Sequence, residues 1–111
     1  MKLTAFVLLH AAPEWLAMER PERDRVGQAA LERAFGAPGL NLRFFDAEAF
    51  HGQVSDVAMI EADSAETWYF AIERLRDTAL IARGYFRVID IIPAFEDGHR
   101  RFAEMEAGHA G

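Results

Sequence analysis

Three aspartates are the residues whose setting most suggests chemistry. Asp46, Asp56 and Asp90 each fall within a stretch that is typical of a β-strand, and each has apolar neighbours. The stretch Tyr85–Asp97 carries apolar residues at both odd and even positions, so both faces of this strand should be covered. Burying an unpaired carboxylate is costly, and a covered aspartate therefore needs a partner or a chemical role.

Alternation along the strands predicts which side chains share a face with each aspartate. The predicted neighbours are Phe86, Val88 and Ile92 for Asp90; Val54, Ala58 and Ile60 for Asp56; and Leu40, Leu42 and Phe44 for Asp46. If two of these carboxylates line one enclosed space, burial and mutual repulsion raise at least one pKa towards neutrality, where a general acid or base works at pH 7. The alternative is a structural aspartate, paired with Arg43, Arg76 or Arg87 or accepting loop N–H groups.

Two histidines and a tryptophan are candidates for the mouth of a pocket. His10 ends the first predicted strand, Trp15 follows it closely, and His51 lies in a predicted loop. Histidine carries protons near neutral pH, although a strand-end histidine can also make a simple hydrogen bond. The candidate catalytic residues are Asp90, Asp56 and His10. The candidate substrate-binding residues are Trp15, Phe44, Asp46, His51, Tyr69 and Phe86, whereas Trp68 is assigned to the core.

Neither a metal site nor a resident cofactor is predicted. The chain has no cysteine, and its four histidines form no HxH or HExxH pair. The segment between Arg43 and Arg74 contains no Lys or Arg but several acidic residues, which we interpret as a solvated face rather than a cation-binding surface. By fold analogy alone, haem binding with His10 or His51 as the axial ligand is a further alternative.

Length and charge limit the class of protein. A chain of 111 residues is expected to form one domain, and its net charge of −6 disfavours nucleic acid as a partner, because phosphate binding needs a basic face. No apolar run approaches the roughly 20 residues of a membrane span. The opening Met1–His10 is interpreted as a strand rather than a signal peptide. We therefore expect a cytoplasmic protein with no nucleic-acid or membrane partner.

The pattern of elements predicts an α+β fold. Strands are predicted at 2–10, 40–46, 54–62 and 85–94, and helices at 21–35 and from a cap at Asp63 or Ser64 onward, with a short helix beginning near Pro13. The order β-α-β-β-α-β is ferredoxin-like, with a four-stranded antiparallel sheet and both helices on one face. We expect residues 1–98 to form this single domain and 99–111 to be a polar, partly disordered tail.

The second face of the predicted sheet is too apolar to face water alone. Phe6 and Leu8 oppose Val7 and Leu9 on the first strand. A second copy of the same sheet would cover it, which gives a homodimer through the sheet face with an enclosed space between two sheets.

Several stretches resemble the darcynin family of small bacterial proteins, to which no function is assigned. They are Leu9-His10, Pro13–Leu16 (PEWL), Arg43–Phe50 (RFFDAEAF), Ser55–Met59 (SDVAM), Tyr69-Phe70, Leu75–Asp77 (LRD), Tyr85-Phe86, Val88–Pro93 (VIDIIP) and Glu96–Gly98 (EDG). The resemblance covers the chain up to about residue 100. It implies one domain of the dimeric α/β-barrel type and bacterial origin, and it supplies no catalytic residues.

Three functions fit these features. The first is an enzyme whose apolar cavity holds an aromatic or polyketide-like molecule, with cofactor-independent oxygenation, or proton-transfer isomerisation or cyclisation, as the reaction. The second is a dimer that binds a small apolar ligand without turning it over. The third is a structural dimer whose interior is filled by Phe6, Phe44, Phe45 and Phe86.

Overall fold

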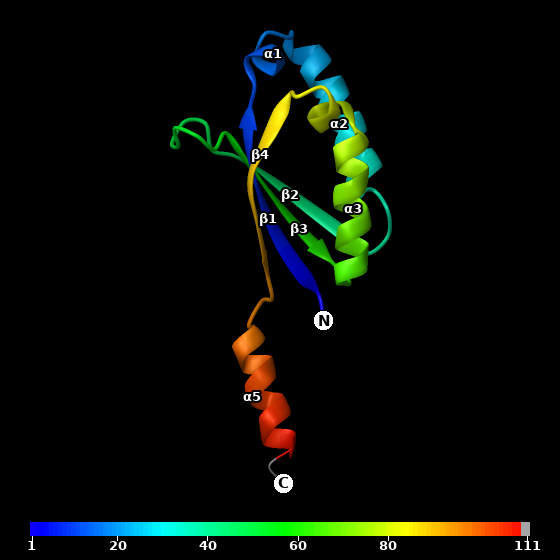
Figure 1. The fold of residues 1–111 in the computed structure, drawn as a ribbon, viewed down its shortest axis with the longest axis vertical. Helices are drawn as coiled ribbons and strands as arrows, with labels where there is room; N and C mark the ends of the chain where they lie inside the picture. The colour runs from blue at the N-terminus through cyan, green and yellow to red at the C-terminus, as the bar shows by residue number, and fades with distance from the viewer. Residues whose placement is uncertain (110–111) are drawn as a thin grey trace.

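The computed structural model describes residues 1–109. The elements are β1 (Leu3–Ala11), α1 (Pro13–Leu16), α2 (Arg20–Phe35), β2 (Leu40–Asp46), β3 (Asp56–Ala62), α3 (Ala65–Asp77), α4 (Ala79–Ala82), β4 (Phe86–Ala94) and α5 (Gly98–His109). The four strands form one antiparallel sheet in the order β2-β3-β1-β4, and α2, α3 and α4 cover one of its faces (Figure 1). The predicted ferredoxin-like α+β fold is therefore confirmed.

Local sequence signals account for most element boundaries. Pro13 begins α1, Pro21 lies in the first turn of α2, and Ser64 caps α3 by accepting a hydrogen bond from the backbone N–H of Thr67 at 3.1 Å. The predicted second helix is divided, because Thr78 adopts an extended backbone that ends α3 and precedes α4. Strand β3 begins at Asp56 rather than Val54, two residues later than predicted.

The core lies between the sheet and the helices. Its buried side chains are Val7, Leu9, Ala30, Ala34, Phe35, Ala58, Ile60, Ala71, Leu75, Leu80 and Phe86. On β1 and β3 every second residue is buried, as the alternation predicts. The other face of the sheet, which we call the open face, has no helix on it (Figure 1).

Strand β4 departs from simple alternation. Asp90 pairs with Leu8, but Val88 pairs with the next β1 residue, Leu9, so that Ile89 forms a bulge. On the N-terminal side of the bulge, Phe86 and Val88 face the helices. On its C-terminal side, Asp90 and Ile92 face the opposite side of the sheet. The prediction that Asp90 shares a face with Phe86 and Val88 is wrong for this reason.

The C-terminal region contains a helix that the sequence analysis did not predict. Helix α5 spans Gly98–His109 and is rich in good helix formers such as Ala, Glu, Arg and Met. Positions 110 and 111, on which part of the predicted polar tail falls, lie outside the described residues. Within residues 1–109, no helix is both long and apolar enough to cross a membrane.

Candidate functional site

A cleft of about 1050 Å³ opens between the sheet and α2, on the helix side of the molecule. Its sheet wall comes from Leu9, Leu42, Phe44, Ala58 and Ile60, and its other walls from residues of α1, α2 and α4. The space is therefore contained within one chain. The sequence analysis had expected it between the sheets of two copies.

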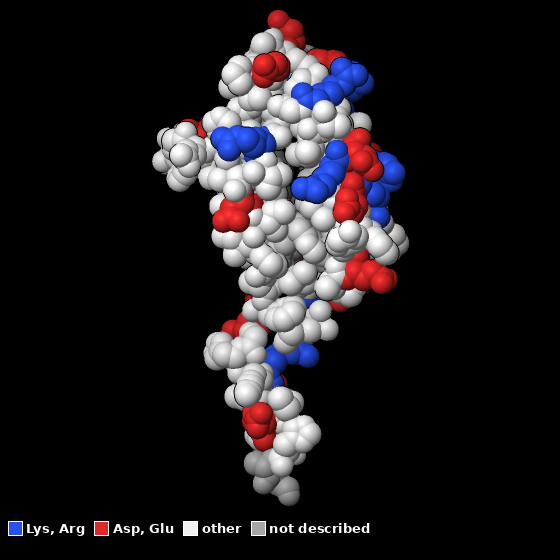
Figure 2. Space-filling view, viewed as in Figure 1, with Lys and Arg blue, Asp and Glu red and all other residues white. Residues whose placement is uncertain are grey.

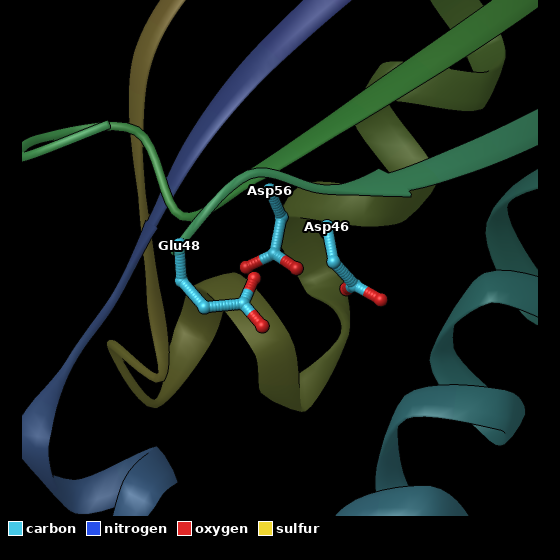
Figure 3. Close-up of side chains that lie close together, drawn as sticks. All are labelled: Asp46, Glu48 and Asp56. Atoms are coloured by element: carbon cyan, nitrogen blue, oxygen red, sulfur yellow. The ribbon is translucent and has the colours of Figure 1, made fainter. Parts of the chain in front are cut away.

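Three carboxylates converge at one end of this cleft. Strands β2 and β3 pair in a register that sets Asp46 directly opposite Asp56, and Glu48 follows in the loop after β2. A backbone hydrogen bond from Ala47 N–H to the Ser55 carbonyl, 2.7 Å long, continues the strand pairing beyond the ladder. One carboxylate oxygen from each of the three acids lies within 4.8 Å of the others, and Figure 3 shows the Glu48 carboxylate turned towards that of Asp56, with Asp46 beside them.

Asp56 is the acid that the fold perturbs most. Only 9% of the residue is exposed, because it begins a buried row on β3 and packs beneath the cleft. Burial, opposed by a 2.7 Å hydrogen bond from the Ser55 hydroxyl, and reinforced by Asp46 and Glu48, raises the pKa of Asp56 from 3.8 to about 6. Asp56 can therefore exchange a proton close to neutral pH.

The same cluster is the group of described residues best placed to hold a cation. Carboxylate oxygens are the ligands that Mg²⁺ and Ca²⁺ prefer. Asp46 and Glu48 are nonetheless exposed, and converging acids at a surface do not by themselves make a metal centre. We therefore treat the cluster as a proton-binding site centred on Asp56, with Asp46 and Glu48 as the charges beside it.

The structure brings five of the predicted site residues into the cleft. Asp56, Asp46 and Phe44 come from β3 and β2, Trp15 from α1, and Phe86 from β4. The Trp15 ring packs against Phe86 with centroids 5.0 Å apart and against Tyr85 at 5.6 Å, both tilted. Gly27 on α2 packs close to this indole, and a Cβ at that position would make an ordinary van der Waals contact with it at 3.5 Å.

Four predicted site residues lie elsewhere. Asp90 is exposed on the open face, where one carboxylate oxygen accepts the N–H of Ile91 at 2.9 Å. His10 hydrogen-bonds the Gln53 carbonyl, and His51 Nδ1 accepts the N–H groups of Gln53 and Val54. Tyr69 is exposed on α3, against Phe70. None of the four is among the residues lining the cleft, so the donors available there do not suit the haem ligation considered above.

Sequence reasoning missed five charged residues of the cleft, which are Glu48 and four residues of α2: Arg20, Arg23, Asp24 and Glu32. Glu48 belongs to the acidic segment that was interpreted as a solvated face, and Arg20 and Arg23 of α2 line the opposite wall. The Arg23 Nε atom is buried, and no hydrogen-bond acceptor contacts it within residues 1–109. The α2 residues could not be predicted because the sequence does not show how α2 packs on the sheet. Helix periodicity alone does not say which acids an arginine on the helix will face.

Comparisons with known proteins support the family resemblance. A family model described as "Darcynin, domain of unknown function" matches residues 1–110. A darcynin from Chromobacterium violaceum is 49% identical over 65 residues, which are 59% of this chain and 82% of that protein. A darcynin homologue from Streptomyces avermitilis is 34% identical over 106 residues, 94% of this chain and 87% of the relative.

Solved structures with the same fold include chlorite dismutases. A mutant chlorite dismutase from Candidatus Nitrospira defluvii superposes with a TM-score of 0.70 at 7% identity, covering 87% of this chain and 40% of that one. The enzyme from the same organism in complex with imidazole gives 0.69 at 7% identity, covering 90% and 46%. The chain spans less than half the length of these proteins, and at such identity the likeness concerns the fold alone.

Proposed function

Because the chain belongs to the darcynin family, a family without an assigned function, its chemistry must be argued from its own residues, and we propose that it catalyses proton transfer on a small molecule bound in the cleft. The observation that carries this proposal is Asp56, a buried carboxyl with a pKa of about 6 that lines the cleft. A group with this pKa is mostly ionised at pH 7 and still basic enough to take a proton.

Asp56 is proposed as the general base and then the general acid. Its carboxylate forms an O–H bond with an acidic hydrogen of the substrate, and the electron pair of the broken C–H bond moves into an adjacent carbonyl to give an enolate. The Asp56 carboxylic acid then returns the proton at another carbon. This sequence isomerises the substrate, or prepares it for ring closure, without any redox change.

The walls of the cleft support a planar, largely apolar substrate. Trp15, Phe86 and Phe44 offer aromatic surfaces, and Leu9 and Leu42 offer aliphatic ones. A volume of about 1050 Å³ lies at the upper end of the usual range for small-molecule sites. Aromatic or polyketide-like molecules have this size and shape, and their flanking carbonyls make the hydrogens between them acidic.

The arginines of α2 support the same chemistry. The wall that α2 contributes carries Arg20 and Arg23, but also Asp24 and Glu32. Among the described residues, no carboxylate forms an ion pair with Arg23. A guanidinium facing the cleft favours an electron-rich oxygen in the ligand, such as the enolate oxygen that forms on proton removal. This wall therefore supports proton transfer more directly than it supports oxygenation.

Hydrogen–deuterium exchange tests the proposal without knowledge of the natural substrate. The protein is incubated in D₂O with 1-phenylbutane-1,3-dione, and NMR follows exchange at the carbon between the carbonyls above the buffer rate. Asp56→Asn should lower the protein-dependent rate by roughly a hundredfold or more. Asp90→Asn is the matched control, because it makes the same change on the open face, and its rate should equal that of the unaltered protein.

Two outcomes would contradict this assignment. Equal exchange rates for the unaltered protein and Asp56→Asn would remove Asp56 as the base. Saturable quenching of tryptophan fluorescence by the diketone, with no protein-dependent exchange, would instead support the non-catalytic ligand-binding function. A carboxyl-detected NMR titration gives an independent check, since Asp56 should titrate near pH 6. A pKa near 4 would contradict its role as the general base.

A further inference from the structure

Helix α5 has no structural support within its own chain. None of the extensive contacts between elements of residues 1–109 includes α5, and almost all of its residues are exposed. Figure 1 shows the helix projecting beyond the end of the sheet, and the molecule is correspondingly elongated, at 62 × 30 × 18 Å. A helix of 12 residues without packing partners is marginal in water, so α5 needs a surface to rest on.

One side of α5 is apolar. Phe102 and Met105 are spaced three residues apart, which places them on the same side of the helix, and each is half exposed. Arg100 and Ala107 lie on the opposite side, and Arg101 flanks the apolar stripe. This pattern is that of a helix that packs one side against another structure.

The open face of the sheet is the complementary unpartnered surface. Strand pairing aligns Phe45, Val57, Leu8 and Asp90 in one row and Arg43, Met59, Phe6 and Ile92 in the next. Phe45 and Ile92, on the two edge strands, are 42% and 48% exposed, so the open face presents large apolar side chains to solvent. Figure 2 shows a largely uncharged surface running from the middle of the body towards α5, with isolated charged groups.

These two surfaces do not meet within one chain. Strand β4 ends at Ala94, and a tight turn at Phe95–Gly98 starts α5 in a direction away from the body. Asp97 holds a left-handed backbone conformation with φ of 52°, and its carbonyl accepts the N–H groups of Arg100 and Arg101. The turn is therefore a defined structure, and it aims the apolar stripe at space outside the chain.

We propose that α5 is an exchanged arm, which lies with Phe102 and Met105 on the open face of a second copy of this chain. The exchange is reciprocal under two-fold symmetry, so that each copy supplies one arm and one sheet, and the contact occurs twice. Charge agrees with this occupant, because Arg101 and Glu106 flank the apolar stripe of the arm, and Asp90 and Arg43 are exposed among the apolar rows of the receiving face. The dimer would form through the sheet face, as the sequence analysis expected, but with the helical arm of the second copy on that face in place of its sheet.

Truncation after Asp97 tests the arm directly. It removes an element that makes no extensive contact in its own chain, so circular dichroism should show that the rest still folds. By sedimentation velocity at micromolar concentration, the full chain should be a dimer and the truncated chain a monomer. A truncated chain that stays dimeric, or a full chain that is monomeric, would overturn the proposal.

A pair of substitutions separates the apolar stripe from the helix as such. Phe102→Glu places a carboxylate in the contact, and Ala107→Glu places the same group on the opposite side of α5. The dimer dissociation constant should rise by roughly a hundredfold for Phe102→Glu and stay nearly unchanged for Ala107→Glu. Equal effects of the two substitutions would refute the predicted side of contact.

Cross-linking identifies the partner surface, and the absence of native cysteine makes it specific. Met59→Cys chains are unfolded, mixed with differently tagged Met105→Cys chains, refolded together and oxidised. The mixed disulfide should form between the two kinds of chain. With Ala107→Cys in place of Met105→Cys it should not. No mixed disulfide in a mixture that is dimeric would overturn the exchange.

Discussion

Asp56 and Asp90 have similar settings in the sequence, but they lie on opposite faces of the sheet and in different environments. Asp56 stands on the helix side, nearly buried, beside Asp46 and under the cleft, and its pKa is raised to about 6. Asp90 stands on the open face, exposed to solvent and held by its own backbone. Apolar neighbours in sequence therefore do not determine whether an acid is buried; the layer that covers its face does.

The largest expected difference between the faces is in stability. Ile60 and Met59 are adjacent on β3, but Ile60 is fully buried under the helices and Met59 belongs to the open face. Ile60→Ala should lower the free energy of unfolding by about 2–5 kcal/mol, because it leaves a cavity. Met59→Ala should cost less than about 1.5 kcal/mol. Urea denaturation at one protein concentration measures both, and similar losses would mean that the open face is packed as tightly as the core.

The second prediction concerns pH. Because the folded-state pKa of Asp56, about 6, lies above its ordinary value of 3.8, this group favours the folded state below pH 4, and that contribution is lost as the pH rises through 6. Asp56→Asn should remove this loss of stability with rising pH. The loss amounts to roughly 1–2 kcal/mol in the free energy of unfolding after allowance for solvent screening in an open cleft. Asp90→Asn is the control and should keep it. Thermal denaturation between pH 4 and 8 measures stability as a function of pH. If Asp56→Asn loses as much stability over this range as the unaltered protein, the raised pKa of Asp56 is not the cause.

A smaller effect should come from the neighbour across the strand pair. Asp46→Asn removes a charge that raises the pKa of Asp56, so the Asp56 pKa should move down from about 6 towards 3.8 without reaching it, because burial remains. Glu61→Gln, on the open side of β3, should leave the titration in place. Carboxyl NMR reads both, and an upward shift in Asp46→Asn would be incompatible with the proposed coupling.

The smallest predicted change has the opposite sign. The Ser55 hydroxyl donates to Asp56 and stabilises its ionised form, so Ser55→Ala should raise the Asp56 pKa further above 6. Ser55→Thr retains the hydroxyl and is the control. The same NMR titration distinguishes the two variants, and a lowered pKa in Ser55→Ala would show that the serine acts otherwise.

The sequence predicts the helices and strands better than it predicts the contacts between them. Periodicity and capping placed β2 at its observed bounds and located α2 and α3 closely, because these signals are local. Whether Asp46 lies opposite Asp56 depends on the strand register, and whether Arg20 and Arg23 line the cleft depends on how α2 packs over the sheet. Both depend on contacts between residues that are far apart in the sequence. His10 and His51 were chosen for their chemistry, but their hydrogen bonds hold the loop before β3 instead.

The bulge at Ile89 has a consequence for insertions and deletions. In a regular strand, the loss of one residue turns every later side chain to the other face. Here Ile89 is the extra residue, and its loss would restore plain pairing of Val88 with Leu9 and of Asp90 with Leu8. A darcynin one residue shorter at this position would thus keep its counterpart of Asp90 outward and its counterpart of Phe86 inward, and an alignment gap there would be structurally silent.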